Sequence, residues 1–370
     1  MEDFEFYMPT RILYGKGCIA KNKSLLSKYG KRAFIITYQI PGRHYALEDI
    51  ISVFDEERIK YTICTDIEEN PSTETIEKVA KKAKEDNVDF IVGVGGGSPI
   101  DAAKAVGVLV KNPEKSGLDL FSEANLESIP ILAVPTTAGT GSEVTCFSVL
   151  TRNDKHTKQA ISPRVFPEIA FLDATYLMGM PDTLTRATAI DALCHCIESY
   201  VSTASSFMSR AIAEIGFRTF SECVQSMKDG DYSYEVREKQ MLISTIGGIV
   251  NTQTGSSLPH GMSYFLTHFK KIPHGLACGL LIKEYLAIFK DKTKINRILE
   301  LTGFESLDAF GQFIDSMLQL DIKVTEEEIE EYAEEFASQK HRFKRHPEPA
   351  GKEEVLQIYR KSLFKNNQKL

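Results

Sequence analysis

The chain has no excess of positive charge. Its 370 residues carry 44 Lys and Arg against 51 Asp and Glu, which leaves a formal net charge of −7. One short basic segment, residues 340–346, follows the acidic run at 326–335. Because an acidic protein repels polyphosphate, this composition argues against a nucleic-acid partner. We interpret the basic segment as a solvated surface, with a position at a domain or subunit boundary as the alternative.

The chain also has no segment suited to a lipid bilayer. Residues 240–269 contain no Asp, Glu, Lys or Arg, but they include many Ser, Thr, Asn and Gln side chains and two histidines. So many polar groups do not fit hydrocarbon. We therefore expect this stretch to be a buried part of a globular protein, and we predict no membrane association.

Two further signals are missing. The N-terminus is acidic and lacks the apolar core of a signal peptide. The seven cysteines are scattered between Cys18 and Cys278, with no zinc-finger or redox spacing. Because a reducing compartment keeps thiols free, a reduced cytoplasmic protein is the simplest interpretation.

The first half of the chain does contain a regular alternation of strand-like and helix-like segments. The strand-like runs lie at 33–37, 61–65, 89–94 and 129–134, and the helical segments lie at 47–54, 70–83 and 98–110. After about Met180 only helical periodicity remains, at 187–200, 209–227, 237–250, 279–289 and 325–336. The sequence therefore predicts an α/β domain, residues 1–180, with a parallel sheet covered on both faces. An all-helical domain, residues 181–370, follows it.

Three helix starts carry capping signals. The pairs Asn70–Pro71 and Ser98–Pro99 each place an N-cap residue before a proline, which favours Asn70 and Ser98 as N-caps. Thr325 followed by Glu328 predicts a capping box.

Two glycine-rich loops follow consecutive predicted strands. The first, residues 93–101, reads Gly-Val-Gly-Gly-Gly-Ser-Pro-Ile-Asp, and the second spans residues 135–145. Glycine lets backbone N–H groups approach an anion, and a helix N-terminus adds partial positive charge. The first loop matches neither the Rossmann fingerprint nor a Walker loop, and alone it is also compatible with a tight turn. Both loops would lie at the carboxyl edge of a parallel sheet, so together they favour a nucleotide.

Four residues in the helical half could bind a metal. Asp191 and His195 lie at i and i+4, on one face of a predicted helix. His260 and His274 each stand between a proline and a glycine. One Asp and three His suit a first-row divalent ion such as Fe²⁺, Zn²⁺ or Mn²⁺. The pair Asp191 and His195 alone would more often be structural.

These motifs, in this order and spacing from residue 6 to about His274, resemble those of the iron-containing (group III) alcohol dehydrogenases. The resemblance implies a Rossmann-like α/β domain and a helical domain of the dehydroquinate synthase-like fold, with the active site in the cleft between them. It also implies reversible hydride transfer between NAD(P) and a primary alcohol or aldehyde, with the metal polarising the substrate oxygen. A homodimer is the family expectation.

The resemblance further implies roles for individual residues. The metal ligands that it implies are Asp191, His195, His260 and His274, with Fe²⁺ as the expected ion and Zn²⁺ as the alternative. The residues that it implies for the cofactor pyrophosphate are Gly96, Gly97 and Ser98. The cofactor contacts that it implies around them are Asp101, Thr136, Thr137 and Thr145, together with Asn70 and Lys158.

Two positions depart from the family pattern. Many members have a second histidine four residues after the third metal ligand, proposed to help move the proton, and this chain has Tyr264 there. A proton relay through Tyr264 or His268 is one interpretation, and an ordinary polar role for His268 is the other. NAD-selective members have an acidic residue after the first strand, where this chain has Tyr38, with Arg43 and His44 just beyond. Since no carboxylate would repel a 2′-phosphate, we expect NADP(H) to be favoured over NAD(H).

The sequence leaves alternatives open. One is a glycerol dehydrogenase-like or dehydroquinate synthase-like metal enzyme of the same fold. The synthase-like lyase must bind a phosphorylated carboxylic acid and so needs Lys or Arg near the metal, and residues 240–269 contain none. A non-catalytic nucleotide- or metal-binding protein is the alternative from another class, and the intact ligand set disfavours it.

Overall fold

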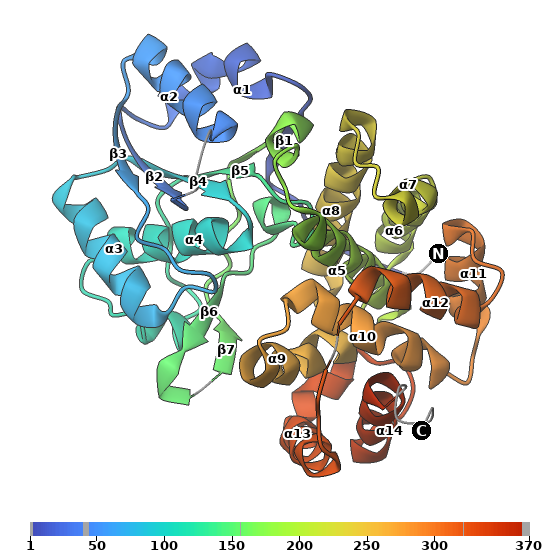
Figure 1. Cartoon of the computed structure of the whole chain (residues 1–370). Coiled ribbons are helices and arrows are strands. Elements are labelled where there is room, and N and C mark those ends of the chain that lie inside the picture. Colours follow the sequence, from blue (N-terminus) through green and yellow to red (C-terminus); the bar gives the residue numbers. More distant parts are fainter. Residues whose placement is uncertain (1–2, 40–43, 156, 321, 365–370) are drawn as a thin grey trace. The chain divides into compact units, whose positions relative to one another are not determined.

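The computed structural model of the chain describes residues 3–39, 44–155, 157–320 and 322–364. It consists of two compact units. One is Met8–Gly179, and the other combines Met1–Tyr7 with Met180–Leu370. We name the first the α/β unit and the second the helical unit (Figure 1).

The α/β unit is built on a sheet of six parallel strands. From one edge to the other, the strands are β1 (Arg11–Tyr14), β8 (Ile169–Leu172), β5 (Ile131–Pro135), β4 (Phe90–Gly95), β2 (Arg32–Thr37) and β3 (Lys60–Cys64). A separate antiparallel pair is formed by β6 (Val149–Arg152) and β7 (Thr157–Ala160). The parallel sheet confirms the fold class predicted for this half of the chain.

Helices cover both faces of the sheet. The first face carries α1 (Cys18–Lys21) and α2 (Tyr45–Glu57), and the second carries α3 (Thr73–Glu85) and α4 (Gly97–Lys111), as Figure 1 shows. The side chains of β2 alternate accordingly: Ala33 and Ile35 belong to the core under α1 and α2, whereas Phe34 and Ile36 belong to the core under α3 and α4. Because both faces are buried, the inner strands β8, β5, β4 and β2 are apolar at nearly every position.

The register of the strands aligns the loops at the carboxyl edge of the sheet. Thr37 pairs with Val94, and Gly95 pairs with Pro135. Strands β2, β4 and β5 therefore end at nearly the same level. The segments that follow them, which include both glycine-rich loops, begin side by side along one edge, where parallel sheets bind ligands.

The N-cap predicted at Asn70 is wrong. Helix α3 begins at Thr73, and the side chain of Ser72 caps it by accepting a hydrogen bond from the Thr75 backbone N–H. Asn70 lies before the helix with a φ of 55°. This left-handed conformation is one that Asn tolerates better than most residues, and it turns the chain ahead of the helix.

The N-cap predicted at Ser98 is also wrong. Helix α4 begins at Gly97 after Gly96, so Ser98 lies inside the first turn. Its hydroxyl accepts a hydrogen bond from the Asn70 backbone N–H at 3.0 Å. The group that was expected to cap the helix therefore joins two neighbouring loops instead.

The helical unit contains no strand among its described residues, which confirms the predicted all-helical class. Its helices are α5 (Asp182–Val201), α6 (Phe207–Ser221), α7 (Val224–Asp229), α8 (Tyr234–Thr254), α9 (Leu258–Lys270), α10 (His274–Ala287), α11 (Thr293–Thr302), α12 (Leu307–Leu318), α13 (Glu326–Ser338) and α14 (Lys352–Leu363). The capping box of Thr325 and Glu328 is present at the start of α13. The helix predicted over 209–227 is interrupted between α6 and α7. None of the described helices is both long enough and apolar enough to cross a membrane.

Helix α5 is buried along most of its length and packs against α8 and α10. Two glycines permit the close approach. A Cβ atom at Gly275 would lie 2.0 Å from the carbonyl oxygen of Ala187, and one at Gly247 would lie 3.0 Å from that of Ala192. Glycine is therefore required at Gly275, and the first turn of α10 lies directly against α5.

Candidate functional site

Three of the four predicted metal ligands come together in the helical unit. Asp191 on α5, His260 on α9 and His274 on α10 form one group with Cys278, whose ligand atoms all lie within 4.8 Å of one another. Asp191 Oδ1 is 3.4 Å from His260 Nε2 and 3.9 Å from His274 Nε2. Ligand atoms that share one tetrahedral ion at about 2.1 Å are separated by roughly 3.4 Å. The spacing of these atoms therefore suits a single first-row divalent ion.

Two buried polar atoms of this group have no hydrogen-bond partner among the described residues. Asp191 and His260 are each 3% exposed, and neither Asp191 Oδ1 nor His260 Nε2 forms a hydrogen bond with any described residue. Leaving such a buried atom unsatisfied costs about 1–3 kcal/mol. Burial disfavours the ionised carboxyl, but the neighbouring imidazoles of His195, His260 and His274 outweigh it and lower the pKa of Asp191 well below its usual range. A carboxylate oxygen and an imidazole nitrogen whose lone pairs accept no hydrogen bond can both coordinate a cation.

His195, the fourth predicted ligand, lies beside this group rather than within it. It follows Asp191 by one turn of α5 and is 6% exposed. Its ring stacks on that of His260, with centroids 4.3 Å apart and an interplanar angle of 28°. Its ligand role therefore stays a prediction.

Cys278 is a member of the group that the sequence did not single out. It lies one turn after His274 on α10, with its Sγ atom 3.9 Å from His274 Nε2. Burial raises the pKa of the Cys278 thiol, although the nearby His260 opposes the shift. The spacing of His274 and Cys278 at i and i+4 was a signal that could have found it.

Glu198 is a second residue that the sequence did not single out. It is fully buried on α5, and its Oε1 atom contacts His260 Nδ1 at hydrogen-bonding distance. Its Oε2 atom accepts a hydrogen bond of 2.6 Å from the Ser257 backbone N–H at the start of α9. A carboxylate on Nδ1 fixes the imidazole tautomer and leaves the lone pair of Nε2 toward the metal position. Since Asp191, His195 and Glu198 lie at i, i+4 and i+7, one helix face could have indicated all three.

The two proposed relay residues lie in different surroundings. The Tyr264 ring stacks on that of His274, with centroids 5.7 Å apart and an angle of 28°. The His268 ring instead meets the edge of Phe269 at 4.8 Å. Tyr264 therefore adjoins the metal-binding group directly, through its ring contact with His274.

In the α/β unit, several predicted cofactor residues converge at the carboxyl edge of the sheet. Lys158 Nζ donates a hydrogen bond of 2.9 Å to Asn70 Oδ1, and the Asn70 N–H donates one of 3.0 Å to Ser98 Oγ. Tyr38 lies close enough to Ser98 for that residue to lower its pKa, but burial outweighs this effect and raises the pKa of Tyr38 to about 12. Residues from β7 and from the segments that follow β2 and β3 thus meet around the start of α4.

The two glycine-rich loops pack against each other. A Cβ atom at Gly96 would lie 3.1 Å from Thr137 Oγ1, and one at Gly97 would lie 2.9 Å from the Thr140 methyl group. The Thr136 N–H donates a hydrogen bond of 2.9 Å to the Gly95 carbonyl oxygen. Bare backbone is therefore needed here for the loops to meet, and the partly exposed Gly96 and Gly97 remain available to an anion.

Asp101 and Thr145 have partners inside the unit. Asp101 accepts hydrogen bonds from Ser142 Oγ at 2.5 Å and from the Val149 N–H at 2.9 Å. The buried Lys104 Nζ donates to Thr145 Oγ1 at 3.2 Å and lies 3.8 Å from Asp101 Oδ1. These contacts brace the second loop against α4, and direct contact of Asp101 and Thr145 with the cofactor stays a prediction.

The surroundings of Tyr38 differ from the expectation in two respects: His44 is not a cation, and carboxylates lie near Tyr38. Arg43 lies outside the described residues. His44 Nε2 is 3.0 Å from Thr37 Oγ1, and burial lowers its pKa, so at neutral pH this imidazole is not a cation. Glu68 and Glu69 are near enough to Tyr38 to contribute to its raised pKa.

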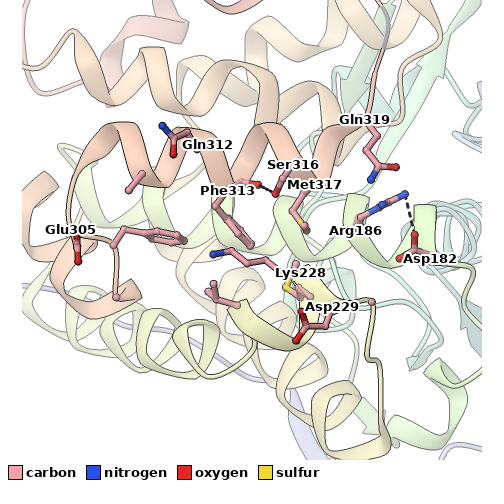
Figure 2. Close-up of a pocket in the computed structure, with 16 residues that line it drawn as sticks. Asp182, Arg186, Lys228, Asp229, Glu305, Gln312, Phe313, Ser316, Met317 and Gln319 are labelled. Carbon is pink, nitrogen blue, oxygen red and sulfur yellow. Dashed lines mark hydrogen bonds and ion pairs between the residues drawn. The ribbon is translucent and has the colours of Figure 1, made fainter.

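A separate cavity of about 830 Å³ lies in the helical unit between the start of α5, α7 and α12. Figure 2 shows Arg186 paired with Asp182 at one side of it, at 3.0 Å. Lys228 extends beneath the Phe313 ring, 5.9 Å from the ring centroid. None of the predicted site residues lines this cavity.

Comparison with known proteins identifies the class to which this site belongs. The family model described as "Iron-containing alcohol dehydrogenase" matches residues 9–174, and that described as "Fe-containing alcohol dehydrogenase family, C-terminal" matches residues 185–363. The chain therefore belongs to the iron-containing alcohol dehydrogenase family.

Individual relatives agree with the family. The NADPH-dependent butanol dehydrogenase of Clostridium saccharobutylicum is 30% identical over 85% of this chain and 82% of its own length. The lactaldehyde reductase of Escherichia coli K12 is 29% identical over 76% and 74%. The crystal structure of an iron-containing alcohol dehydrogenase of Thermotoga maritima matches 98% of this chain and 99% of its own, with a TM-score of 0.90 and 34% identity. The chain is accordingly a metal- and nicotinamide-dependent oxidoreductase of alcohols and aldehydes.

Proposed function

We propose that the chain catalyses the reversible reduction of a small aldehyde to its primary alcohol, with NADP(H) favoured and with iron as the active ion. The observation that carries this proposal is the convergence of Asp191, His260 and His274 from three helices, with Asp191 Oδ1 and His260 Nε2 buried and without a hydrogen-bond partner among the described residues. His195, stacked on His260, is the proposed fourth ligand. Zinc is the alternative ion, because Fe²⁺ lies below it in the affinity order.

A divalent ion held here would polarise the substrate oxygen, and the nicotinamide would donate or accept the hydride. Glu198 orients the His260 imidazole through Nδ1. For the proton we propose Tyr264, because its ring lies on His274 and burial raises its pKa, so the hydroxyl keeps a proton to donate. His268 is the second candidate, and its ring contacts that of Phe269.

The α/β unit is proposed to bind the cofactor through the residues that the resemblance implied. Gly96, Gly97 and Ser98 would receive the pyrophosphate at the start of α4, where the helix adds partial positive charge. Asn70 and Lys158 support this assignment because their side chains are joined next to Ser98. Thr136 and Thr137 belong to the adjoining loop.

The preference for NADP(H) is a separate part of the proposal. Tyr38 supports it, because this side chain carries no charge that repels a 2′-phosphate. Glu68 and Glu69 weigh against it, but Glu68 accepts hydrogen bonds of 2.8 Å from the Ser72 N–H and from the Thr75 hydroxyl. Glu69 is therefore the remaining charge to test, and Glu69→Gln should raise the preference for NADPH if it opposes the phosphate.

The experiment is anaerobic. Purified apo-protein receives Fe²⁺ or Zn²⁺, then butanal, and the absorbances of NADPH and NADH are followed in separate reactions. Metal-dependent consumption of NADPH is the expected result. Consumption of NADH alone would keep the enzyme class and reject the cofactor preference, and faster turnover with zinc would reject iron. No turnover with either cofactor, despite bound metal, would reject the proposed function.

We also propose that the chain is a homodimer in a reducing, cytoplasmic compartment. All seven cysteines are free and buried, which supports a chain that needs no disulfide. Light scattering coupled to size-exclusion chromatography measures the oligomeric state, and a monomer mass near 41.4 kDa would reject the dimer.

A further inference from the structure

Arg342 lies in the basic segment, residues 340–346, which the sequence suggested to be a solvated surface. The structure corrects this interpretation in part, because Arg342 and Phe343 are only partly exposed and His346 is 6% exposed. The guanidinium carbon of Arg342 lies 5.5 Å from the ring centroid of Tyr264. A cation from a distant part of the chain therefore packs against α9, in the stretch that itself contains no charged residue.

Arg342 meets α9 next to the metal-binding group. A Cβ atom at Gly261 would lie 2.9 Å from Arg342 Nη1, so the absence of a side chain at Gly261 makes room for the guanidinium. Gly261 directly follows His260. The other α9 residue under the guanidinium, Tyr264, stacks on His274. The positive charge is thus held against the neighbours of two predicted metal ligands.

Among the described residues, no Asp or Glu forms an ion pair with Arg342. Other arginines of the same unit do have such partners: Arg297 pairs with Glu214 at 2.8 Å, and Arg360 pairs with Glu330 at 3.1 Å. Holding a partly buried charge without a counter-ion is unfavourable. An anion from outside the chain would remove this cost.

The orientation of the guanidinium suits a planar anion. Arg342 Nε donates a hydrogen bond of 2.5 Å to Gln339 Oε1, and this bond fixes one side of the fork. No described residue accepts a hydrogen bond from either Nη atom. Two Nη groups held in one plane match the two oxygens of a carboxylate. A single arginine also balances the one charge of a carboxylate better than the −1.5 to −2 of a phosphate group.

We propose that Arg342 binds a carboxylate at the far end of the substrate chain, so that the preferred substrates are the aldehydes of short oxo-acids and the corresponding hydroxy-acids. This inference rests on the proposed function and names its substrate class. The reaction itself is unchanged: the aldehyde carbon takes the hydride, the oxygen takes the proton, and the carboxylate stays intact. Arg342 lies more than seventy residues after the charge-poor stretch 240–269 against which it packs, so that stretch alone gives no sign of a cation near the metal-binding group.

The test compares two substrates of matched length, 4-oxobutanoate and butanal, with the metal-loaded enzyme and its better nicotinamide cofactor. The ratio of their kcat/KM values is the measured quantity. We expect the native protein to favour 4-oxobutanoate, and Arg342→Ala to lower the ratio by roughly 10- to 100-fold, because hydrogen bonds to charged groups are among the strong ones. Arg342→Lys should keep part of the preference, since it retains the charge but not the fork.

Lys344→Ala is the matched control. Lys344 is an exposed cation of the same segment, and removing it lowers the net charge equally, so the ratio should stay at its native value. Succinate should also inhibit butanal reduction competitively, and less so in Arg342→Ala. A ratio that favours butanal, or one that Arg342→Ala leaves unchanged while both rates fall, would overturn the inference and keep the proposed function. Failure of the native enzyme on both aldehydes would reject the proposed function itself.

Discussion

Each unit of the molecule buries a cluster of charged side chains, and the two clusters differ in what they still lack. In the α/β unit, Lys104 Nζ donates to Ser142 Oγ, Thr145 Oγ1 and the Phe147 carbonyl oxygen, at 3.0, 3.2 and 2.6 Å. In the helical unit, Asp191 Oδ1 and His260 Nε2 are equally buried but form no hydrogen bond with a described residue. The Lys104 cluster finds all its hydrogen-bond partners within the chain, and we interpret it as stabilising the fold. The Asp191 cluster has ligand atoms without such partners, and we interpret it as a site for a metal ion.

The same criterion distinguishes structural residues from proposed binding residues within one motif. Asp101 stands in the first glycine-rich loop and, from the sequence, it is grouped with Gly96 and Ser98. In the structure its two carboxylate oxygens accept from Ser142 and Val149. The hydrogen bonds of Asp101 therefore brace the loop, whereas cofactor binding by Gly96 and Ser98, which are partly exposed, stays a prediction.

The largest expected effect breaks the internally paired cluster. Lys104→Met removes the charge that faces Asp101 and leaves that carboxyl buried without its cation, which is expected to destabilise the α/β unit by about 3–5 kcal/mol. Chemical denaturation followed by circular dichroism measures the loss. Metal content should not change. An unaltered unfolding midpoint would show that Lys104 is not a brace.

The next largest effect is expected from removing a ligand of the proposed metal site, the group of Asp191, His260, His274 and Cys278. His274→Ala should leave a folded protein that no longer binds the metal and no longer turns over substrate. In the native protein, metal at 100 times its Kd should add about 2.7 kcal/mol of stability, and the variant should show none of this gain. His268→Ala is the matched control, because this histidine of α9 lies outside the group. Retained metal stoichiometry in His274→Ala would remove it from the ligand set.

A smaller effect is expected from changing Glu198, which contacts the proposed ligand His260 and the Ser257 backbone N–H. Glu198→Gln keeps the shape of the side chain but weakens its hold on His260 Nδ1, so metal affinity should fall by roughly 10- to 100-fold. A competitive titration with a chelator measures it. Glu198 is fully buried, so the stability of the metal-free variant must be measured beside it. Equal metal affinities in the two proteins would make Glu198 a purely structural residue.

Much of the fold could be predicted from the sequence, for a physical reason. The strands of a sheet covered on both faces must be apolar at nearly every position, so β2, β4 and β5 stand out as short β-branched runs. By contrast, β1 and β8 are only four residues long, and the burial pattern of β1 is mostly exposed. Such short strands become recognisable only through their pairing, which is a tertiary property.

The candidate site shows the same limit. Asp191 and His195 could be paired from helical spacing alone, because they share one helix. That His260 and His274 approach Asp191 depends on how α9 and α10 pack on α5, through contacts such as that of Gly275 with Ala187. Spacing carries no record of such packing. The resemblance to a family named these ligands, and the structure then supplied Glu198 and Cys278.

The smallest expected effect is a pH dependence of stability that arises in the α/β unit, at His44. His44 Nδ1 accepts a hydrogen bond of 3.4 Å from the Leu47 N–H and caps α2, while its Nε2 is 3.0 Å from Thr37 Oγ1. Burial lowers the pKa of His44 below its ordinary value, with Glu48 opposing the shift. The folded protein therefore holds this imidazole neutral, and the unfolded chain takes up a proton first as the pH falls.

It follows that the contribution of His44 is fully present above pH about 6.5 and is lost as the pH falls below it. The loss should be about 1 kcal/mol, the worth of an N-cap. Unfolding of the metal-free protein at pH 7.5 and 5.5 measures this loss. The metal is removed so that the pH dependence of metal binding by the histidines of the helical unit does not contribute. His44→Asn keeps a capping side chain without a titrating group, so it should reduce the dependence on pH by that amount. If the variant and the native protein lose stability equally between the two pH values, acid acts elsewhere in the chain and the cap at α2 is insensitive to it.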